Sequence, residues 1–142
     1  MDRPTGTNIR IKVVGVGGAG GNALARMDRS KSDLLESLVV NTDVQALNDI
    51  KSISTVPIGP RVTGGLGSGG SPEIGRKAIR ESHDKISKLL DGADMVFVTA
   101  GMGGGTGTGA APIIADIAKR QGALTIAVVT KPFSFEGIAR TE

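Results

Sequence analysis

The stretch AGMGGGTGTGAAP, residues 100–112, decides how this chain folds, because it joins two regular elements through a run of glycines. The preceding apolar run at 95–98 has no polar alternation, which is typical of a strand buried on both faces of a parallel sheet. The following segment at 110–119 has helix-forming composition, with Gly122 just past its end. Glycine has no side chain, so six glycines at this junction indicate that something lies close to the backbone.

A second passage of this kind lies near the amino terminus. The β-branched run at 9–14 predicts a strand that ends at Gly15, and residues 22–27 have helix-forming composition. The linking sequence GVGGAGGN contains the pattern G-x-G-x-x-G, which is the fingerprint of dinucleotide-binding turns. Asp43, about 20 residues further on, would then be the acid that binds a ribose. An NAD-binding domain is therefore one interpretation of this part of the chain.

The glycine passage at 100–109 argues against that interpretation, because a dinucleotide-binding domain needs only one phosphate loop. No lysine in the chain follows a glycine, which excludes the Gly-Lys pair of a P-loop. Two glycine loops that open helices, with a third glycine-rich segment at 64–70, suit a longer phosphate chain. Unpaired N–H groups and the positive end of the helix dipole stabilise an anion at such a helix start without any lysine.

The remaining patterns alternate between strands and helices. Further strands are predicted at 38–40, 55–58 and 124–129, and further helices at 44–49 and 72–90. Pro57 favours a sheet edge for its strand, Thr42 or Asp43 is the expected N-cap of the first helix, and Ser71 that of the second. This order predicts an α/β fold with a doubly wound, mainly parallel sheet and helices on both faces, and ligands bind such sheets beyond the carboxyl ends of the strands.

Composition excludes several classes of function. The 142 residues suit one domain, and 16 of the 22 glycines fall in three clusters separated by patterned sequence, so the chain is not of low complexity. The absence of cysteine excludes disulfides and thiolate metal sites. A net charge of +3 with no tyrosine or tryptophan indicates no nucleic-acid partner. There is no run of about 18 apolar residues, so we expect a cytoplasmic protein that does not insert into a membrane.

The glycine blocks carry a specific resemblance. GGGTGTG, residues 103–109, resembles the signature of the tubulin/FtsZ family of GTPases. The blocks KVVGVGGAGGNA, VNTDVQAL, GGLGSGGSPEIGR, AGMGGGTGTGAAP and TKPFSFEGIAR occur in the order and spacing of the family's bacterial-type members. The resemblance implies a Rossmann-like fold that binds GTP or GDP with Mg²⁺ and polymerises head to tail into the cell-division ring. It also implies membrane-tether and regulatory partners at the division site, and hydrolysis of GTP at the junction between subunits.

The same resemblance implies a set of GTP-binding residues. By matching position these are Gly18, Ala19, Gly20, Gly21, Asn22, Asn41, Asp43, Gly69, Gly70, Gly105, Thr106, Gly107, Glu136 and Arg140. Residues 18–22 and 105–107 match loops that bind phosphate, with Asn22 also near the base, and residues 67–71 match the loop that senses the γ-phosphate. The chain reads Gly-Gly-Ser at 69–71, where the family more often has Gly-Ala-Asn.

Some of these residues also have simpler interpretations. Glu136 and Arg140 resemble the family's ribose-binding residues, and the alternative is that their i, i+4 spacing forms only a surface ion pair. Asp43 matches the family's second loop and is equally suited to be a plain helix cap. The resemblance implies no catalytic residue and no protein ligand for the metal within this sequence.

The resemblance also predicts how the domain is organised. Residues 1–8 are expected to be a tail and residues 9–142 a GTP-binding domain that lacks the family's central helix and second domain. The acidic residue that reads guanine and the acidic loop that acts on the neighbouring subunit's GTP would then lie outside this sequence, so we expect the chain alone to be inactive in hydrolysis. The alternative is a non-hydrolysing fragment that binds nucleotide or caps a filament.

Overall fold

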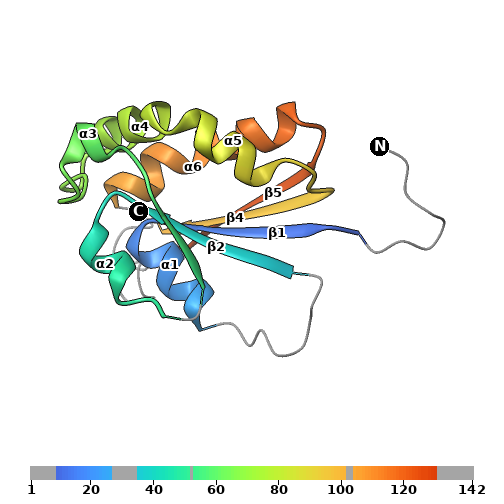
Figure 1. Cartoon of the computed structure of the whole chain (residues 1–142), viewed down its shortest axis with the longest axis horizontal. Coiled ribbons are helices and arrows are strands. Elements are labelled where there is room, and N and C mark those ends of the chain that lie inside the picture. The colour runs from blue at the N-terminus through green and yellow to red at the C-terminus, as the bar shows by residue number, and fades with distance from the viewer. Residues whose placement is uncertain (1–8, 27–34, 52, 102–103, 131–142) are drawn as a thin grey trace, which may run out of the picture.

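The described part of the protein forms a five-stranded sheet in the order β3-β2-β1-β4-β5, with every pair of neighbours parallel (Figure 1). The computed structural model describes residues 9–26, 35–51, 53–101 and 104–130. The strands are β1 (Ile11–Val16), β2 (Leu35–Asn41), β3 (Ser54–Pro57), β4 (Met95–Gly101) and β5 (Leu124–Thr130). The predicted parallel α/β fold is confirmed, and β3 with Pro57 lies at the sheet edge, as expected.

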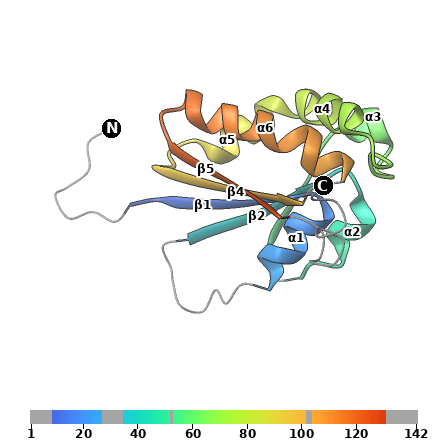
Figure 2. The ribbon, with the colours of Figure 1, turned by 180° about the vertical axis from the view of Figure 1, so that it is seen from behind.

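Helices cover both faces of the sheet, as the two opposite views show (Figures 1 and 2). One face carries α1 (Gly17–Ala25) and α2 (Val44–Asn48). The other carries α3 (Pro60–Thr63), α4 (Pro72–Glu81), α5 (His83–Leu90) and α6 (Gly105–Arg120). The larger core lies on this second face and includes Val14, Val98, Ile79 and Ile114, whereas a smaller cluster around Leu24 and Val39 lies under α1. None of the helices in the described ranges combines the length and apolar character that a membrane span requires.

Two helices begin earlier than their sequences predict. We expected helices from residues 22 and 110, but α1 begins at Gly17 and α6 at Gly105, so the glycine runs form the first turns. The reason is close packing. A Cβ built on Gly20 would lie 2.4 Å from the carbonyl oxygen of Thr99 in β4, so only glycine lets α1 approach the sheet this closely. Glycine's poor helix propensity is overridden by this tertiary contact.

The single helix predicted over 72–90 is two helices, α4 and α5, that meet at Ser82. Ser82 has φ −102° and ψ 17°, outside the helical region. Its buried hydroxyl accepts a hydrogen bond of 2.9 Å from the backbone N–H of Gly59. The hydrogen bond between the Ser82 side chain and the backbone of another segment stabilises the bend at this point. The apolar stripe continues across the bend, because Ile79 and Ile86 are both buried in the larger core.

We expect Ser82→Ala to lower the free energy of unfolding by about 1–3 kcal/mol, because the buried N–H of Gly59 would lose its acceptor. The matched control is Ser87→Ala, whose hydroxyl accepts an exposed bond from Gln121; we expect a change within about 0.5 kcal/mol. Urea unfolding of both variants measures the difference. Equal effects of the two substitutions would contradict this role for Ser82.

The strands β4 and β5 are less buried than their apolar sequences predict. In β4 burial alternates, with Val96 and Val98 fully enclosed and Phe97 only half-buried. In β5, Leu124 and Val129 keep 59% and 55% of their surface exposed. The burial on both faces predicted for the strand at 95–98 is therefore incomplete in β4, although both α1 and α6 pack on it, and the described side chains of β5 are mostly exposed. The reason is that β5 ends the described sheet and is packed against α6, whereas α1 packs on β1, β2 and β4.

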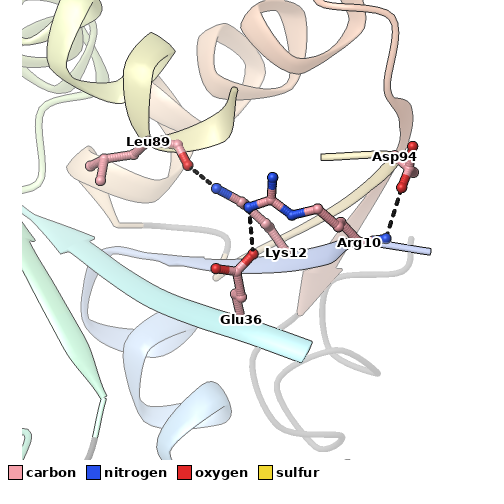
Figure 3. A network of polar contacts seen from close by, with 5 residues as sticks. All are labelled: Arg10, Lys12, Glu36, Leu89 and Asp94. Carbon is pink, nitrogen blue, oxygen red and sulfur yellow. Dashed lines mark hydrogen bonds and ion pairs between the residues drawn. The ribbon is translucent and has the colours of Figure 1, made fainter. Parts of the chain in front are cut away.

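Polar contacts at the amino end of β1 connect this strand to α5, to β2 and to the residue before β4 (Figure 3). The buried Lys12 donates from Nζ to the carbonyl oxygen of Leu89 near the end of α5. The negative end of the helix dipole also stabilises a cation at this position. The backbone N–H of Arg10 donates to Asp94 Oδ2 at 2.7 Å, and its guanidinium pairs with Glu36 at 3.2 Å. These contacts hold the edge of the sheet opposite to the carboxyl ends of the strands.

Candidate functional site

A cleft of about 370 Å³ lies at the carboxyl ends of β1, β2 and β4, the edge at which parallel sheets bind ligands. Three loops and two helix starts enclose it. Its lining is Val16, Gly17, Gly18, Ala19, Asn41, Thr42, Asp43, Ala46, Leu66, Gly67, Ser68, Gly69, Gly101, Gly104, Gly105, Thr106 and Gly107. The three glycine clusters of the sequence therefore meet around one space.

Two helix N-termini reach the cleft without a capping side chain. Helix α1 begins at Gly17 and α6 at Gly105, and neither has a side-chain hydrogen bond at its N-cap. By contrast, Asp43 caps α2 and Ser71 caps α4, as expected for both residues. The first-turn N–H groups of α1 and α6 are thus left for a ligand, and together with the two helix dipoles they favour an anion.

Glycine allows the enclosing segments to touch. Gly17 has φ +77°, and a Cβ built on it would lie 3.1 Å from the backbone nitrogen of Gly107, so the two helix starts are in close contact. A Cβ on Gly105 would lie 2.4 Å from Ser68 Oγ and 2.5 Å from the backbone nitrogen of Ser71. The segment at 67–71 is therefore packed directly against the first turn of α6.

The described residues bring a single charged group, a carboxylate, to the cleft. Among the described lining residues Asp43 is the only charged one, and neither lysine nor arginine contributes. Asp43 Oδ1 accepts hydrogen bonds from the backbone N–H groups of Gln45 and Ala46, at 3.0 and 3.2 Å. The described residues therefore offer an anion in this cleft only backbone N–H groups and neutral side chains, and its charge is opposed by Asp43 unless a cation lies between them.

Three buried hydroxyls form a chain along the cleft. Thr106 Oγ1 lies 2.7 Å from Thr42 Oγ1 and 3.0 Å from Ser68 Oγ. The exposed fractions of Thr42, Thr106 and Ser68 are 1%, 5% and 7%. Sequence reasoning named Thr106 but missed Thr42 and Ser68 as individual site residues. Two features of the sequence could have indicated them. Thr42 lies just after a predicted strand, and Ser68 lies inside a glycine-rich segment that was expected to bind phosphate.

Asn41 supplies an oriented donor. Its Oδ1 accepts from the backbone N–H groups of Thr42 at 2.7 Å and Asp43 at 3.2 Å, which identifies the oxygen of the carboxamide. The amide nitrogen is then the group that Asn41 can offer to the cleft. A second hollow of about 480 Å³ adjoins the first between α1 and α2, and Asn41 lines both.

The structure brings most of the predicted site residues together. The main cleft is lined by Gly18, Ala19, Asn41, Asp43, Gly69, Gly105, Thr106 and Gly107, and the adjoining hollow by Gly21 and Asn22. Gly20 and Gly70 line neither space, since Gly20 packs against β4 and Gly70 is exposed in its loop. Glu136 and Arg140 lie outside the described residues. Lining residues that were not predicted include Val16, Gly17, Gly101 and Gly104.

The sheet order and a cleft that offers two uncapped helix N-termini define a Rossmann-like α/β domain whose cleft favours an anion. More narrowly, the chain belongs to the tubulin/FtsZ family, because the model of that family's GTPase domain matches residues 10–142.

Named relatives agree with this assignment. The chain is 56% identical over 132 residues to the cell division protein FtsZ of Pseudomonas aeruginosa. The matched region covers 93% of this chain and 34% of the relative. It is also 56% identical over 133 residues to FtsZ of Buchnera aphidicola, covering 94% and 35%. The chain thus spans about a third of the length of these relatives.

Solved structures show the same fold. An empty FtsZ dimer from M. jannaschii superimposes with a TM-score of 0.85 at 47% identity, covering 94% of this chain and 39% of that one. A GTPγS-bound protofilament of CetZ2 from Haloferax volcanii gives a TM-score of 0.75 at 32% identity, covering 85% and 39%. The predicted tubulin/FtsZ fold is confirmed.

Proposed function

We propose that this cleft binds the phosphate chain of GTP or GDP, and that the chain is the nucleotide-binding part of an FtsZ-type GTPase that polymerises in cell division. The observation that carries the proposal is the convergence of two uncapped helix N-termini, α1 and α6, on one cleft in a chain of the tubulin/FtsZ family. Charge-assisted hydrogen bonds stabilise by about 1.5–3 kcal/mol each, so a few backbone contacts can offset the cost of association.

The residues on this chain bind and orient the nucleotide. Backbone N–H groups at the starts of α1 and α6 would hold phosphate oxygens, with further donors from Asn41 and the hydroxyl of Thr106. Hydrolysis by water would use acidic groups that a neighbouring subunit supplies. That proposal agrees with the lining of the cleft, whose one described acid, Asp43, already caps α2.

Self-association is the second part of the proposal. The related structures include an FtsZ dimer and a GTPγS-bound CetZ2 protofilament, and these support self-association into a filament. We propose that the nucleotide lies between its subunits. We further propose action in the cytoplasm at the division site, with membrane-tether and regulatory proteins as partners. A capping fragment without turnover has no specific observation in its favour.

The residues of this cleft fit a Mg²⁺ ion that is bound together with the nucleotide. The described residues contain no group of three or more histidine, cysteine, aspartate or glutamate side chains that could hold a metal alone. One carboxylate, that of Asp43, lines the cleft with the hydroxyls of Thr42, Ser68 and Thr106. Mg²⁺ typically takes one or two carboxylates, phosphate oxygens and water, and this donor set fits that mode. When bound, the ion would offset the charge of the phosphates next to Asp43.

We expect Asp43→Asn to bind GTP about fivefold more tightly than the unmodified chain in the absence of Mg²⁺, and to gain less affinity when Mg²⁺ is added. Asparagine is as good an N-cap as aspartate but carries no charge to repel phosphate. Calorimetric titration with GTP, with and without Mg²⁺, measures both effects. Asp84→Asn, an equal charge change at an exposed position on α5, is the control. Equal gains from Mg²⁺ in both variants would show that Asp43 does not act with the ion.

The proposed function is tested by titrating the 142-residue chain with GTP, ATP and NAD in the presence of Mg²⁺. We expect GTP to bind. Equal binding of GTP and ATP would mean that the cleft holds phosphates while the base is read elsewhere. Binding of NAD alone would overturn the proposal in favour of a dinucleotide-binding domain, and no binding of any nucleotide would overturn it for this chain.

A further inference from the structure

We propose that Thr42 and Ser68 are positioning residues that act through Thr106, by holding its hydroxyl so that its hydrogen is free to bond a phosphate oxygen in the cleft. The inference rests on the proposed function. It concerns three side chains from three segments: Thr42 follows β2, Ser68 lies between α3 and α4, and Thr106 is in the first turn of α6. All three line the cleft.

Counting hydrogens leads to this arrangement. The three hydroxyl groups have three hydrogens, but only two hydrogen bonds join them, one between Thr42 and Thr106 and one between Ser68 and Thr106. One hydrogen is therefore left over. The structure gives no other hydrogen bond to these three oxygens within the described residues, and the one buried side-chain oxygen there without a partner is that of Ser37. The spare hydrogen is thus available to whatever fills the cleft.

Geometry assigns the spare hydrogen to Thr106. Thr106 is the middle member, and a hydroxyl oxygen can accept two hydrogen bonds, one from Thr42 and one from Ser68. Its position in the first turn of α6 places its hydroxyl beside the uncapped N–H groups to which an anion is drawn. Exposure disfavours only Thr42, which is 1% exposed against 5% for Thr106 and 7% for Ser68. Between the last two, the central place in the chain of hydroxyls and the position in the first turn of α6 favour Thr106. An anion in the cleft favours the arrangement in which both neighbours donate to Thr106.

The arrangement also connects two walls of the cleft, the loop after β2 and the segment around Ser68, to the hydroxyl of Thr106. Ser68 belongs to the segment that touches the start of α6, since a Cβ on Gly105 would lie 2.4 Å from its Oγ. Thr42 precedes Asp43, the N-cap of α2. When Thr106 bonds a phosphate oxygen, its two donors hold the loop after β2 and the segment around Ser68 in place, and linked hydrogen bonds of this kind strengthen one another.

The test is a set of coupled substitutions measured by calorimetric titration of the chain with GTP and Mg²⁺. We expect Thr106→Val to weaken binding about tenfold, and Thr42→Val or Ser68→Ala to weaken it about two- to fivefold each. In the Thr106→Val background, the same two substitutions should have no further effect, because they act only through the missing hydroxyl. Thermal unfolding of each variant without nucleotide shows whether the fold is retained.

A conservative variant separates positioning from packing. Thr42→Ser keeps the hydroxyl and loses the methyl group, so we expect it to bind GTP like the unmodified chain, whereas Thr42→Val keeps the shape and loses the bond. The reverse order would show a packing role and overturn the inference. Additive losses in the Thr106→Val background would also overturn it, while leaving GTP binding by the unmodified chain, and hence the proposed function, intact. If the unmodified chain binds no GTP, the proposed function fails and this inference fails with it.

Discussion

Gly105→Ala is expected to weaken GTP binding by more than about a hundredfold, because the added methyl group has no space. Its Cβ would lie 2.4 Å from Ser68 Oγ and 2.5 and 2.7 Å from the backbone nitrogen and oxygen of Ser71. Two of these three atoms are backbone atoms, so the first turn of α6 and the segment around Ser71 must move apart. Displacement of binding groups by about 1 Å can cost about a hundredfold. Overpacking of this kind also lowers the free energy of unfolding by about 1–3 kcal/mol.

The neighbouring glycine provides the matched control for stability. Gly104 has φ −88° and ψ 147°, which alanine adopts freely, and a Cβ there would meet no atom of the described residues within 4 Å apart from its chain neighbours. We therefore expect Gly104→Ala to unfold at the same urea concentration as the unmodified chain. Calorimetric titration with GTP and urea unfolding of both variants give the comparison. If Gly105→Ala binds GTP within a few-fold of the unmodified chain, this glycine is not needed to shape the cleft.

Gly109→Ala is expected to destabilise the fold by about 3 kcal/mol, a fall in Tm of roughly 10 °C for a chain of this size. In an ordinary helix the same substitution stabilises, since alanine has the better helix propensity by about 1 kcal/mol. Here the Cβ would lie 2.0 Å from the carbonyl oxygen of Pro72 and 2.8 Å from the backbone nitrogen of Arg76. Both atoms belong to α4, so α4 and α6 could not keep their present distance.

Thr108→Ala is the control for this second substitution. Thr108 is exposed in the same turn of α6, and we expect its replacement to change the free energy of unfolding by no more than about 0.5 kcal/mol. Thermal unfolding followed by circular dichroism measures both variants. A Gly109→Ala chain that is as stable as the unmodified one, or more so, would mean that α4 and α6 can separate at little cost.

Much of the fold was readable from local patterns. Ser71 before Pro72 predicted the start of α4, and Asp43 was one of two residues expected to cap α2; the structure contains both caps. Pro57 predicted an edge strand and β3 is one. These signals succeed because a cap, or a proline without an N–H group, acts on the residues beside it in the chain.

The starts of α1 and α6 could not be found in this way. N-cap rules look for serine, threonine, aspartate or asparagine, but the residues before these helices are Val16 and Gly104. Glycine is a poor helix former, so local propensity places Gly17 and Gly105 outside the helix. Contacts with segments distant in the sequence decide otherwise, and no local pattern reports them.

The order of strands and helices, and the edge of the sheet at which a ligand would bind, follow from the residues alone, because apolar periodicity and helix caps are local properties. The family follows from the resemblance of the glycine blocks to those of its members. The role of each glycine does not follow from the sequence. Gly18 borders the cleft, whereas Gly20, two residues later, packs against the carbonyl oxygen of Thr99. Which glycine faces a ligand and which lets two backbones touch depends on atoms brought together by folding, and that is also why the hydroxyls of Thr42, Ser68 and Thr106 meet only in three dimensions.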